Sequence, residues 1–139
     1  MTAFNNASLR EAVRLYLRDE CRESVLAKYG PMEDWDVSGV TDMSDLFDRP
    51  CNYGYEHIPD LSRWDVSNVT NMSHMFVNCK LFDCDLSKWD VSKVTDMRCM
   101  FAGAKEFRGD VSTWRVGNVT DTNGMFENAH AFNGDLSAW

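Results

Sequence analysis

The sequence predicts an α/β repeat protein, a solenoid of short parallel strands and short helices that follows an N-terminal capping helix. Two observations support this prediction. Five tryptophans divide most of the chain into nearly equal intervals: they stand at Trp35, Trp64, Trp89, Trp114 and Trp139. An amphipathic helix pattern precedes the first of them. A unit of 25 residues is too short to fold alone, so neighbouring units must bury each other's apolar faces.

The segment before the repeats has the pattern of one long helix. Ser8 with Glu11 three residues later is a capping box, and apolar residues continue at helical spacing to Tyr29, where Gly30 ends the helix. The first unit of a repeat stack needs its apolar edge covered. We therefore interpret residues 8–29 as an N-terminal cap, with a partner-binding amphipathic helix as the alternative.

A closely similar sequence motif, called the phrase below, begins at each of the first four tryptophans. It reads WDVSGVTDMSDLF from Trp35, WDVSNVTNMSHMF from Trp64, WDVSKVTDMRCMF from Trp89 and WRVGNVTDTNGMF from Trp114. A second shared segment, such as EFRGDVSTW from Glu106, joins each phrase to the next. The single domain therefore divides into a capping lead-in at residues 1–34 and about four repeats of 25 residues at residues 35–139.

Within one unit the hydrophobic period changes. Apolar residues follow helical spacing from Val94 to Ala104, and Thr95 is a favourable N-cap. Over residues 89–92 the pattern alternates with a period of two, which is typical of a short strand. Each unit is expected to contribute one strand and one helix, with strands about 4.8 Å apart. The first interval is longer, and residues 49–57 are expected to form a surface loop.

Comparison between units separates expected core from expected surface. Columns that are apolar in every unit should be buried, and freely varying columns should face solvent. The expected core columns are Val40, Val69, Val94 and Val119; Leu46, Met75, Met100 and Met125; Phe47, Phe76, Phe101 and Phe126; and Phe82, Phe107 and Phe132. We interpret the tryptophan column as stacked core, with an aromatic platform for a sugar as the alternative.

The phrase WDVSNVTNMSHMF and its continuation LFDCDLSKWDVSKVTDM resemble the BspA-like leucine-rich-repeat surface protein family. The same units form a repeat domain of unknown function that is also known from mycoplasma lipoproteins. The resemblance covers residues 35–139. It implies a right-handed leucine-rich-repeat-like solenoid, a role in adhesion or protein binding, and no catalytic residues. The expected function is a non-enzymatic repeat scaffold that mediates protein–protein interaction or adhesion through its variable exposed columns.

Candidate partner-binding residues come from the variable columns. They are Asp45, His74, Cys99, Arg98, Lys88 and Arg63. His74 and Cys99 occupy one column, but no third group is specified that would orient a Cys–His pair for nucleophilic catalysis. The three histidines lack the spacing of metal ligands. We therefore predict no catalytic, cofactor-binding or metal-binding residues.

One aspartate recurs in every unit, and this column bears on the alternative function of a calcium-stabilised or glycan-binding surface adhesin. Its members are Asp60, Asp85, Asp110 and Asp135. Stacked about 5 Å apart, their carboxylates would repel one another, and a ladder of calcium ions would relieve this. Calcium takes six to eight oxygens, however, and one carboxylate per coil supplies few of them. We expect each aspartate to accept backbone N–H groups in its own turn instead.

Composition limits the partners. The net charge of -8 argues against nucleic acid, and no apolar stretch reaches the roughly 18 residues that membrane insertion requires. The five cysteines form no CxxC pair and are expected to be free thiols. The absence of a secretory signal pattern favours a cytoplasmic or virion-associated location, whereas the family resemblance favours the cell surface. A protein partner of unknown identity remains.

The last unit has no cover of its own in the sequence. The expected strand at residues 135–139 would leave an open edge, since no further repeat or capping helix follows it. Two interpretations stand beside each other. The chain is part of a longer array, or the edge pairs with a second copy in an end-to-end homodimer.

Overall fold

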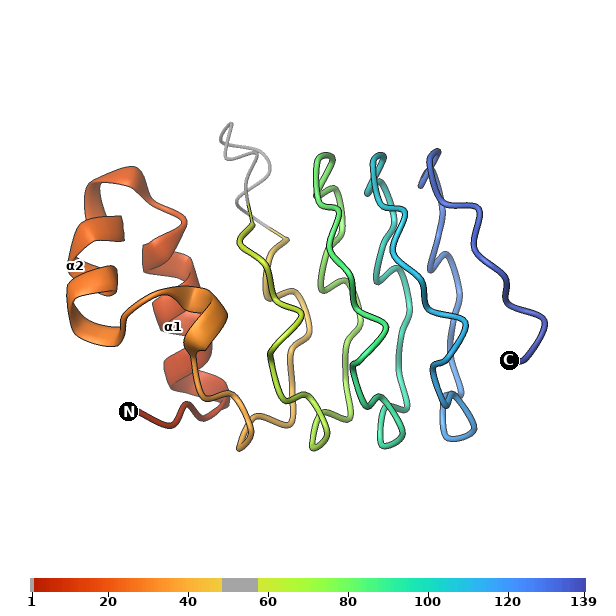
Figure 1. The fold of residues 1–139 in the computed structure, drawn as a ribbon, viewed down its shortest axis with the longest axis horizontal. Helices are drawn as coiled ribbons and strands as arrows, with labels where there is room; N and C mark the ends of the chain where they lie inside the picture. Colours follow the sequence, from red (N-terminus) through yellow and green to blue (C-terminus); the bar gives the residue numbers. More distant parts are fainter. Residues whose placement is uncertain (1, 49–57) are drawn as a thin grey trace.

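The computed structural model describes residues 2–48 and 58–139 and shows two helices beside a stack of irregular coils (Figure 1). The helices are α1 (Asn6–Tyr16) and α2 (Asp19–Tyr29), and a single 3-10 turn, η1 (Met32–Asp34), leads into the repeats. From there, each repeat of the sequence makes one coil. Successive coils lie side by side, and the helices and the C-terminus lie at opposite ends of the stack (Figure 1).

The predicted α/β solenoid of short parallel strands and short helices is wrong. In the described ranges the chain forms two α-helices, both before the repeats, and no strand or sheet. Strand-like pairing between coils is confined to isolated parallel bridges. These bridges join Asp42 to Asn71, Asn71 to Asp96, and Asp96 to Asp121. The coils are held together by other hydrogen bonds and by their side chains.

Consecutive turns replace the helix predicted for residues 94–104. The N–H groups of Met100, Ala102 and Ala104 donate to the carbonyls of Met97, Cys99 and Phe101, three residues earlier. The N–H groups between them donate to the next coil. Cys99 and Gly103 have φ values of 53° and 74°, in the left-handed region. Neither an α-helix nor a strand continues through such residues, because both need negative φ.

Thr95, the predicted N-cap, joins two coils instead. Its N–H lies 2.8 Å and its hydroxyl 3.2 Å from the carbonyl oxygen of Thr70. The same two bonds run from Thr70 to Thr41 and from Thr120 to Thr95. The threonine therefore recurs in every phrase because it links a coil to the preceding one.

The strands predicted at residues 89–92 and 135–139 are also wrong, since each of these segments contains a turn. An aspartate oxygen accepts the N–H of the serine two residues later, at 3.0 Å for Asp90 and Ser92 and at 2.9 Å for Asp135 and Ser137. This side chain takes the place of a backbone carbonyl in closing the turn. The alternation of apolar and polar residues thus arises from tight turns.

Stacked aromatic rings fill the core. Phe76 lies 5.6 Å from Phe101 in the next coil, with 9° between the ring planes, and 4.0 Å from Phe82 in its own coil. The valine, methionine and phenylalanine columns predicted as core are buried in the inner coils. In the last coil Val119, Phe126 and Phe132 are only partly buried. Met125 of the same coil stays buried, so only part of the core needs a coil on both sides.

The tryptophans are part of this core. Trp35, Trp64, Trp89 and Trp114 are 3–4% exposed. Each indole N–H donates to a carbonyl earlier in the chain, as Trp114 does to Leu86 at 3.0 Å. This bond satisfies the indole N–H, which would be costly to bury without a partner. In the inner coils the tryptophan column is therefore the predicted stacked core, whereas Trp139 is only partly buried.

The N-terminal segment covers the first coil, but as two helices. The chain breaks between α1 and α2 at Leu17 and Arg18, where one helix was predicted over residues 8–29. The N-cap is Asn5, whose side chain accepts the N–H of Ser8, so the predicted Ser8–Glu11 capping box is wrong. Buried side chains of both helices belong to the same core as the coils. The predicted loop at residues 49–57 lies outside the described residues.

The N-terminal aromatic residues pack around the first tryptophan. The rings of Phe4, Tyr16 and Tyr29 lie 4.8, 6.1 and 6.0 Å from that of Trp35. Neither helix in the described part of the chain has the length and hydrophobicity needed to cross a membrane. The two helices thus close the apolar end of the stack that faces the N-terminus.

We predict that Phe101→Ala destabilises the protein by about 3–5 kcal/mol, because it removes a buried ring that stacks on both neighbouring coils. Phe126→Ala is the matched control, since Phe126 is only partly buried and stacks on a coil at one side. We expect a clearly smaller loss for the control. Urea unfolding followed by tryptophan fluorescence measures both. Equal losses would show that stacking between coils does not hold the core.

A second prediction concerns pH. Hydrogen bonds from the serine two residues later hold the carboxyl pKa below its usual value at six aspartates: Asp36, Asp60, Asp85, Asp90, Asp110 and Asp135. A carboxyl pKa that is lower in the folded than in the unfolded state increases the free energy of unfolding at pH values above the ordinary aspartate pKa of about 3.9. That stability is lost as pH falls through the folded value. The urea midpoint should therefore stay level from about pH 7 to 5 and fall below about pH 4.

The double variant Asp85→Asn and Asp110→Asn tests this pH dependence. Asparagine keeps an oxygen for the serine N–H, as Asn71 already does for Ser73 at 2.9 Å, but it does not titrate. We expect the variant to fold and to lose less stability between pH 5 and pH 3 than the wild type. If the variant loses as much stability as the wild type between pH 5 and pH 3, these carboxyl groups are not the source of the pH dependence.

Candidate functional site

The candidate surface is the outer side of the segment with consecutive turns, which we call the turn face. It consists of the exposed and half-buried side chains of residues 42–48, 71–77, 96–102 and 121–127. In each coil one of its residues has positive φ. These residues are Asp45, His74, Cys99 and Gly124, with φ of 55°, 57°, 53° and 65°. The backbone therefore repeats along the turn face while the side chains differ.

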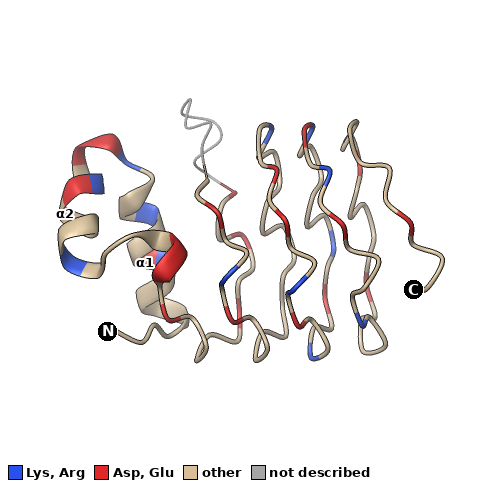
Figure 2. Cartoon of the chain, viewed as in Figure 1, with Lys and Arg blue, Asp and Glu red and all other residues tan. Residues whose placement is uncertain are grey.

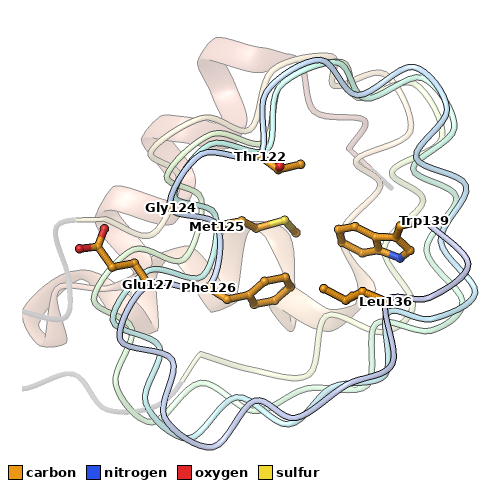
Figure 3. Close-up of a pocket in the computed structure, with 7 residues that line it drawn as sticks. All are labelled: Thr122, Gly124, Met125, Phe126, Glu127, Leu136 and Trp139. Carbon is orange, nitrogen blue, oxygen red and sulfur yellow. The ribbon is translucent and has the colours of Figure 1, made fainter.

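The structure divides the predicted partner-binding residues between two sides of the stack. Asp45, His74, Cys99 and Arg98 belong to the turn face. Arg63 and Lys88 each stand directly before a tryptophan. In the last coil, the corresponding segment contains Leu136 and Trp139. These two residues lie across the core from Gly124 and Glu127 of the turn face (Figure 3). The six residues therefore do not form one site.

Two predicted residues share a column on the turn face but have different partners. His74 Nδ1 lies 3.9 Å from a carboxylate oxygen of Asp45 in the preceding coil. The Cys99 thiol lies 3.6 Å from the carbonyl oxygen of Asn123 in the following coil. The described contacts thus direct the imidazole and the thiol to opposite neighbours, and they show no hydrogen bond between the two groups.

Arg98 connects charged groups of two coils. Its guanidinium lies 3.4 Å from a carboxylate oxygen of Asp96 and 3.7 Å from one of Asp121. The side chains of all three residues are between a quarter and half exposed, so water screens these pairs. Arg98 is therefore better placed to present charge to a partner than to stabilise the stack.

Acidic residues outnumber basic ones on the turn face. Its segments hold six carboxylates, one arginine and one histidine: Asp42, Asp45, Asp48, Asp96, Asp121 and Glu127, with Arg98 and His74. The matching segments around the tryptophans, residues 31–38, 60–67, 85–92, 110–117 and 135–139, hold nine carboxylates and three basic residues: Glu33, Asp34, Asp36, Asp60, Asp65, Asp85, Asp90, Asp110 and Asp135, with Arg63, Lys88 and Arg115. Acidic positions recur from coil to coil in Figure 2. Both sides of the stack are therefore acidic, and the turn face has a single arginine and no lysine.

The aspartates that could form a calcium ladder each accept a hydrogen bond within their own turn. Asp60, Asp85, Asp110 and Asp135 each accept the N–H of the serine two residues later, at 2.9 to 3.0 Å. In residues 2–48 and 58–139 no three His, Cys, Asp or Glu side chains are grouped so that they could hold a metal ion. The observed role of the column is to close turns.

Arg63 and Lys88 stand next to carboxylates. The Arg63 guanidinium pairs with Asp34 of η1, so it ties the lead-in to a later coil. The charge of Lys88 contributes to the low pKa of Asp85, after the hydrogen bonds from Ser87. Arg63 thus has a structural partner that its sequence position did not reveal, because the two residues of the pair lie far apart in the chain.

The buried thiol of Cys84 was not singled out from the sequence. Burial raises its pKa to about 12, and its Sγ donates to Asp60 Oδ1 at 3.3 Å. The thiol is therefore neutral at pH 7 and a poor nucleophile. One signal in the sequence was available: the same column holds Gly109 and Gly134, which indicates a position with little room.

A hollow of about 360 Å³ opens at the last coil. Its apolar lining consists of Met125, Phe126, Leu136 and Trp139, with Thr122, Gly124 and Glu127 along one side (Figure 3). One ring face of Phe126 stacks on Phe101 at 5.6 Å, and Trp139 stacks on Trp114 at 6.4 Å. The hollow thus lies at the end of the stacked phenylalanine and tryptophan rings and is not a cavity inside the fold.

Comparison with known proteins gives one match. The model of a family described as "Mycoplasma protein of unknown function, DUF285" matches residues 19–139, which include α2 and all the repeats. No curated protein and no solved structure matches the chain. Since the match covers most of the sequence, the chain belongs to this family of mycoplasma proteins of unknown function, DUF285.

Proposed function

We propose that the protein is a non-enzymatic repeat scaffold that binds another protein through the turn face. The observation that carries the proposal is the contrast between a repeating backbone and varying side chains. At the position with positive φ the side chain changes from Asp45 to His74 to Cys99 to Gly124, while φ stays between 53° and 65°. Variation on a constant frame is how repeat proteins present different chemistry to a partner.

The frame is held independently of these side chains. The N–H groups of Asp45, His74 and Cys99 donate to the carbonyls of Ser73, Arg98 and Asn123 in the next coil, at 2.8 to 3.0 Å. Main-chain bonds of this kind do not depend on which side chain is present. We therefore expect substitutions on the outer side to alter recognition more than the fold, with β-branched residues excluded at the positions with positive φ.

The charge of the turn face favours a basic partner. Its single arginine, Arg98, already lies between two of the six carboxylates. Arg10 of α1 lies 3.7 Å from Asp42. Asp45, Asp48 and Glu127 are the carboxylates left to attract a cationic surface and to speed its approach at low ionic strength. The proposed partner is therefore a protein with a segment rich in lysine or arginine.

The contacts of the reactive groups support a non-enzymatic role. His74 and Cys99 are directed to different neighbours, and the Cys84 thiol is neutral because burial raises its pKa to about 12. An activated nucleophile needs a base within hydrogen-bonding reach or a lowered pKa. The resemblance of the repeats to the BspA-like family supports the same role, since that family is associated with adhesion and protein binding.

The proposal predicts that a partner crosslinks to one side of the stack. A photo-reactive amino acid replaces Arg98 on the turn face in one variant and Lys88 on the opposite side in the other. Both residues are exposed, so neither replacement disturbs the core. After irradiation in the source cells, we expect a specific crosslinked protein from position 98 and none from position 88.

Charge variants then test the basic character of that partner. The double variant Asp45→Asn and Glu127→Gln should weaken its binding at least about tenfold at low salt, and the difference should shrink as salt is added. The matched control, Asp85→Asn with Asp110→Asn, removes the same charge from the opposite side and should bind like the wild type. Equal weakening by both pairs, or crosslinking only from position 88, would contradict the proposal.

A further inference from the structure

His74 is the one histidine in the four segments of the turn face. Its side chain is 35% exposed, and its Nδ1 lies 3.9 Å from a carboxylate oxygen of Asp45, whose side chain is 56% exposed. Histidine is the side chain that ordinarily gains a proton between about pH 8 and pH 5. An imidazole that water can reach therefore stands beside a carboxylate on the proposed binding surface.

The preceding coil supplies the carboxylates near His74, which are Asp42, Asp45 and Asp48. Asp45 faces the imidazole, whereas Asp42 has Arg10 of α1 at 3.7 Å. Asp48 lies one turn further along the chain, where its N–H donates to the carbonyl of Asp45. Residues 71–77, the segment of His74 itself, hold no other titratable side chain. Among the described residues, Asp45 is the acid within ion-pair distance of the imidazole.

The following coil supplies one cation and one thiol. The Arg98 guanidinium lies 3.4 Å from Asp96 and 3.7 Å from Asp121. The Cys99 thiol lies 3.6 Å from the carbonyl oxygen of Asn123. Neither of these contacts involves the imidazole. Protonation of His74 therefore acts on Asp45 before any other charged group.

A charged imidazole changes what the turn face presents to a partner. It attracts the Asp45 carboxylate, one of the three carboxylates left for a cationic surface, the others being Asp48 and Glu127. It also adds positive charge to a surface with a single arginine. Carboxyl groups ordinarily stay ionised down to about pH 5, so the histidine changes charge while they do not. Both effects oppose a basic partner.

The main chain at His74 is held in either charge state. Its N–H donates to the carbonyl of Arg98 at 2.8 Å, and its carbonyl accepts the N–H of Val77 at 3.2 Å. Its φ of 57° is one that histidine adopts more readily than most residues. The gain of a proton therefore alters the charge of the surface and leaves the coils in place.

We propose that His74 makes binding at the turn face sensitive to pH: as the pH falls from about 7.5 to about 5.5, its imidazole becomes charged, pairs with Asp45 and weakens the binding of a basic partner. This inference rests on the proposed function of the turn face and adds regulation to that same surface. The partner binds most tightly when the imidazole is neutral and is released as the surroundings become mildly acidic.

The test titrates the ¹⁵N-labelled protein with a synthetic peptide of eight arginines, whose charge is the same at both pH values. Amide NMR signals of residues 96–102 report binding at the turn face, and those of residues 85–92 report the opposite side. The ring signals of His74 report its protonation. We expect the Kd measured at the turn face to rise about two- to fivefold between pH 7.5 and pH 5.5, the effect of one exposed charge pair.

Three variants assign the effect to His74. His74→Asn gains no charge and tolerates the positive φ, so it should bind the peptide equally at both pH values. His74→Arg is charged throughout and should bind at pH 7.5 as weakly as the wild type does at pH 5.5. The matched control is His130→Asn, because His130 is exposed but lies outside the turn face; it should keep the wild-type pH dependence. The urea midpoint at both pH values checks that each variant is folded.

The inference is wrong if the wild type binds the peptide equally at both pH values, or if His74→Asn keeps the wild-type pH dependence. Asp45→Asn with Glu127→Gln, titrated at pH 7.5, checks the proposed function separately. If this double variant binds more weakly than the wild type and His74→Asn has no effect on the pH dependence, only the regulation fails. If the double variant binds the peptide as the wild type does, the basic partner of the turn face and its regulation both fail.

Discussion

The alternating use of main-chain N–H groups is the constraint on which the rest of the structure depends. In the turn segment one N–H closes a local turn, as Met100 does with Met97, and the next donates to the following coil, as Phe101 does to Met125. A strand would direct its N–H groups to neighbouring strands, and a helix would keep them all within the chain. The alternation holds coils together without either element. It also explains the left-handed residues, since each of them reverses the chain between two turns.

The spacing of the coils follows from these bonds, and the core follows from the spacing. The stacked phenylalanines repeat at 5.4 to 6.0 Å with nearly parallel planes. A ring in each coil therefore covers the ring before it, and the tryptophan N–H reaches a carbonyl of the preceding coil. Because the interior is filled mainly by similar apolar side chains in successive coils, one repeat can follow another with little new packing. Most differences between repeats then lie on the outside, although buried positions also vary, as Leu46 and Met75 show.

The surfaces of the protein differ in what they offer. The turn face combines a constant backbone with varying, mainly acidic side chains, whereas the backbone of the opposite side carries Arg63, Lys88 and Arg115 as well; aspartates close turns on both sides. The two ends of the stack differ as well. At one end two helices cover the first coil and Arg10 donates to the carbonyl of Ser44, and at the other Phe126, Leu136 and Trp139 line a hollow of about 360 Å³.

The repeat period and the identity of the core columns could be predicted from the sequence, because each of these positions recurs as the same or a similar apolar residue. Burial of the Phe76, Met100 and Trp89 columns is the clearest case. The secondary structure within each repeat could not be predicted from the sequence. Residues 94–104 have the spacing of a helix face, and residues 89–92 have that of a strand, yet both form turns. Turns with side-chain acceptors such as Asp90 can produce either period, so the pattern alone did not distinguish them.

Tertiary structure alone decided which groups meet. The pairing of Arg63 with Asp34 and the bonds from Met97 and Cys99 to Asp121 and Asn123 depend on how the coils align. The sequence by itself determined that units of equal length stack and which side chains lie inside, since burial follows from repeated local chemistry. The direction of the hydrogen bonds and the sides on which charges gather were decided in three dimensions, because they arise between residues about 25 positions apart.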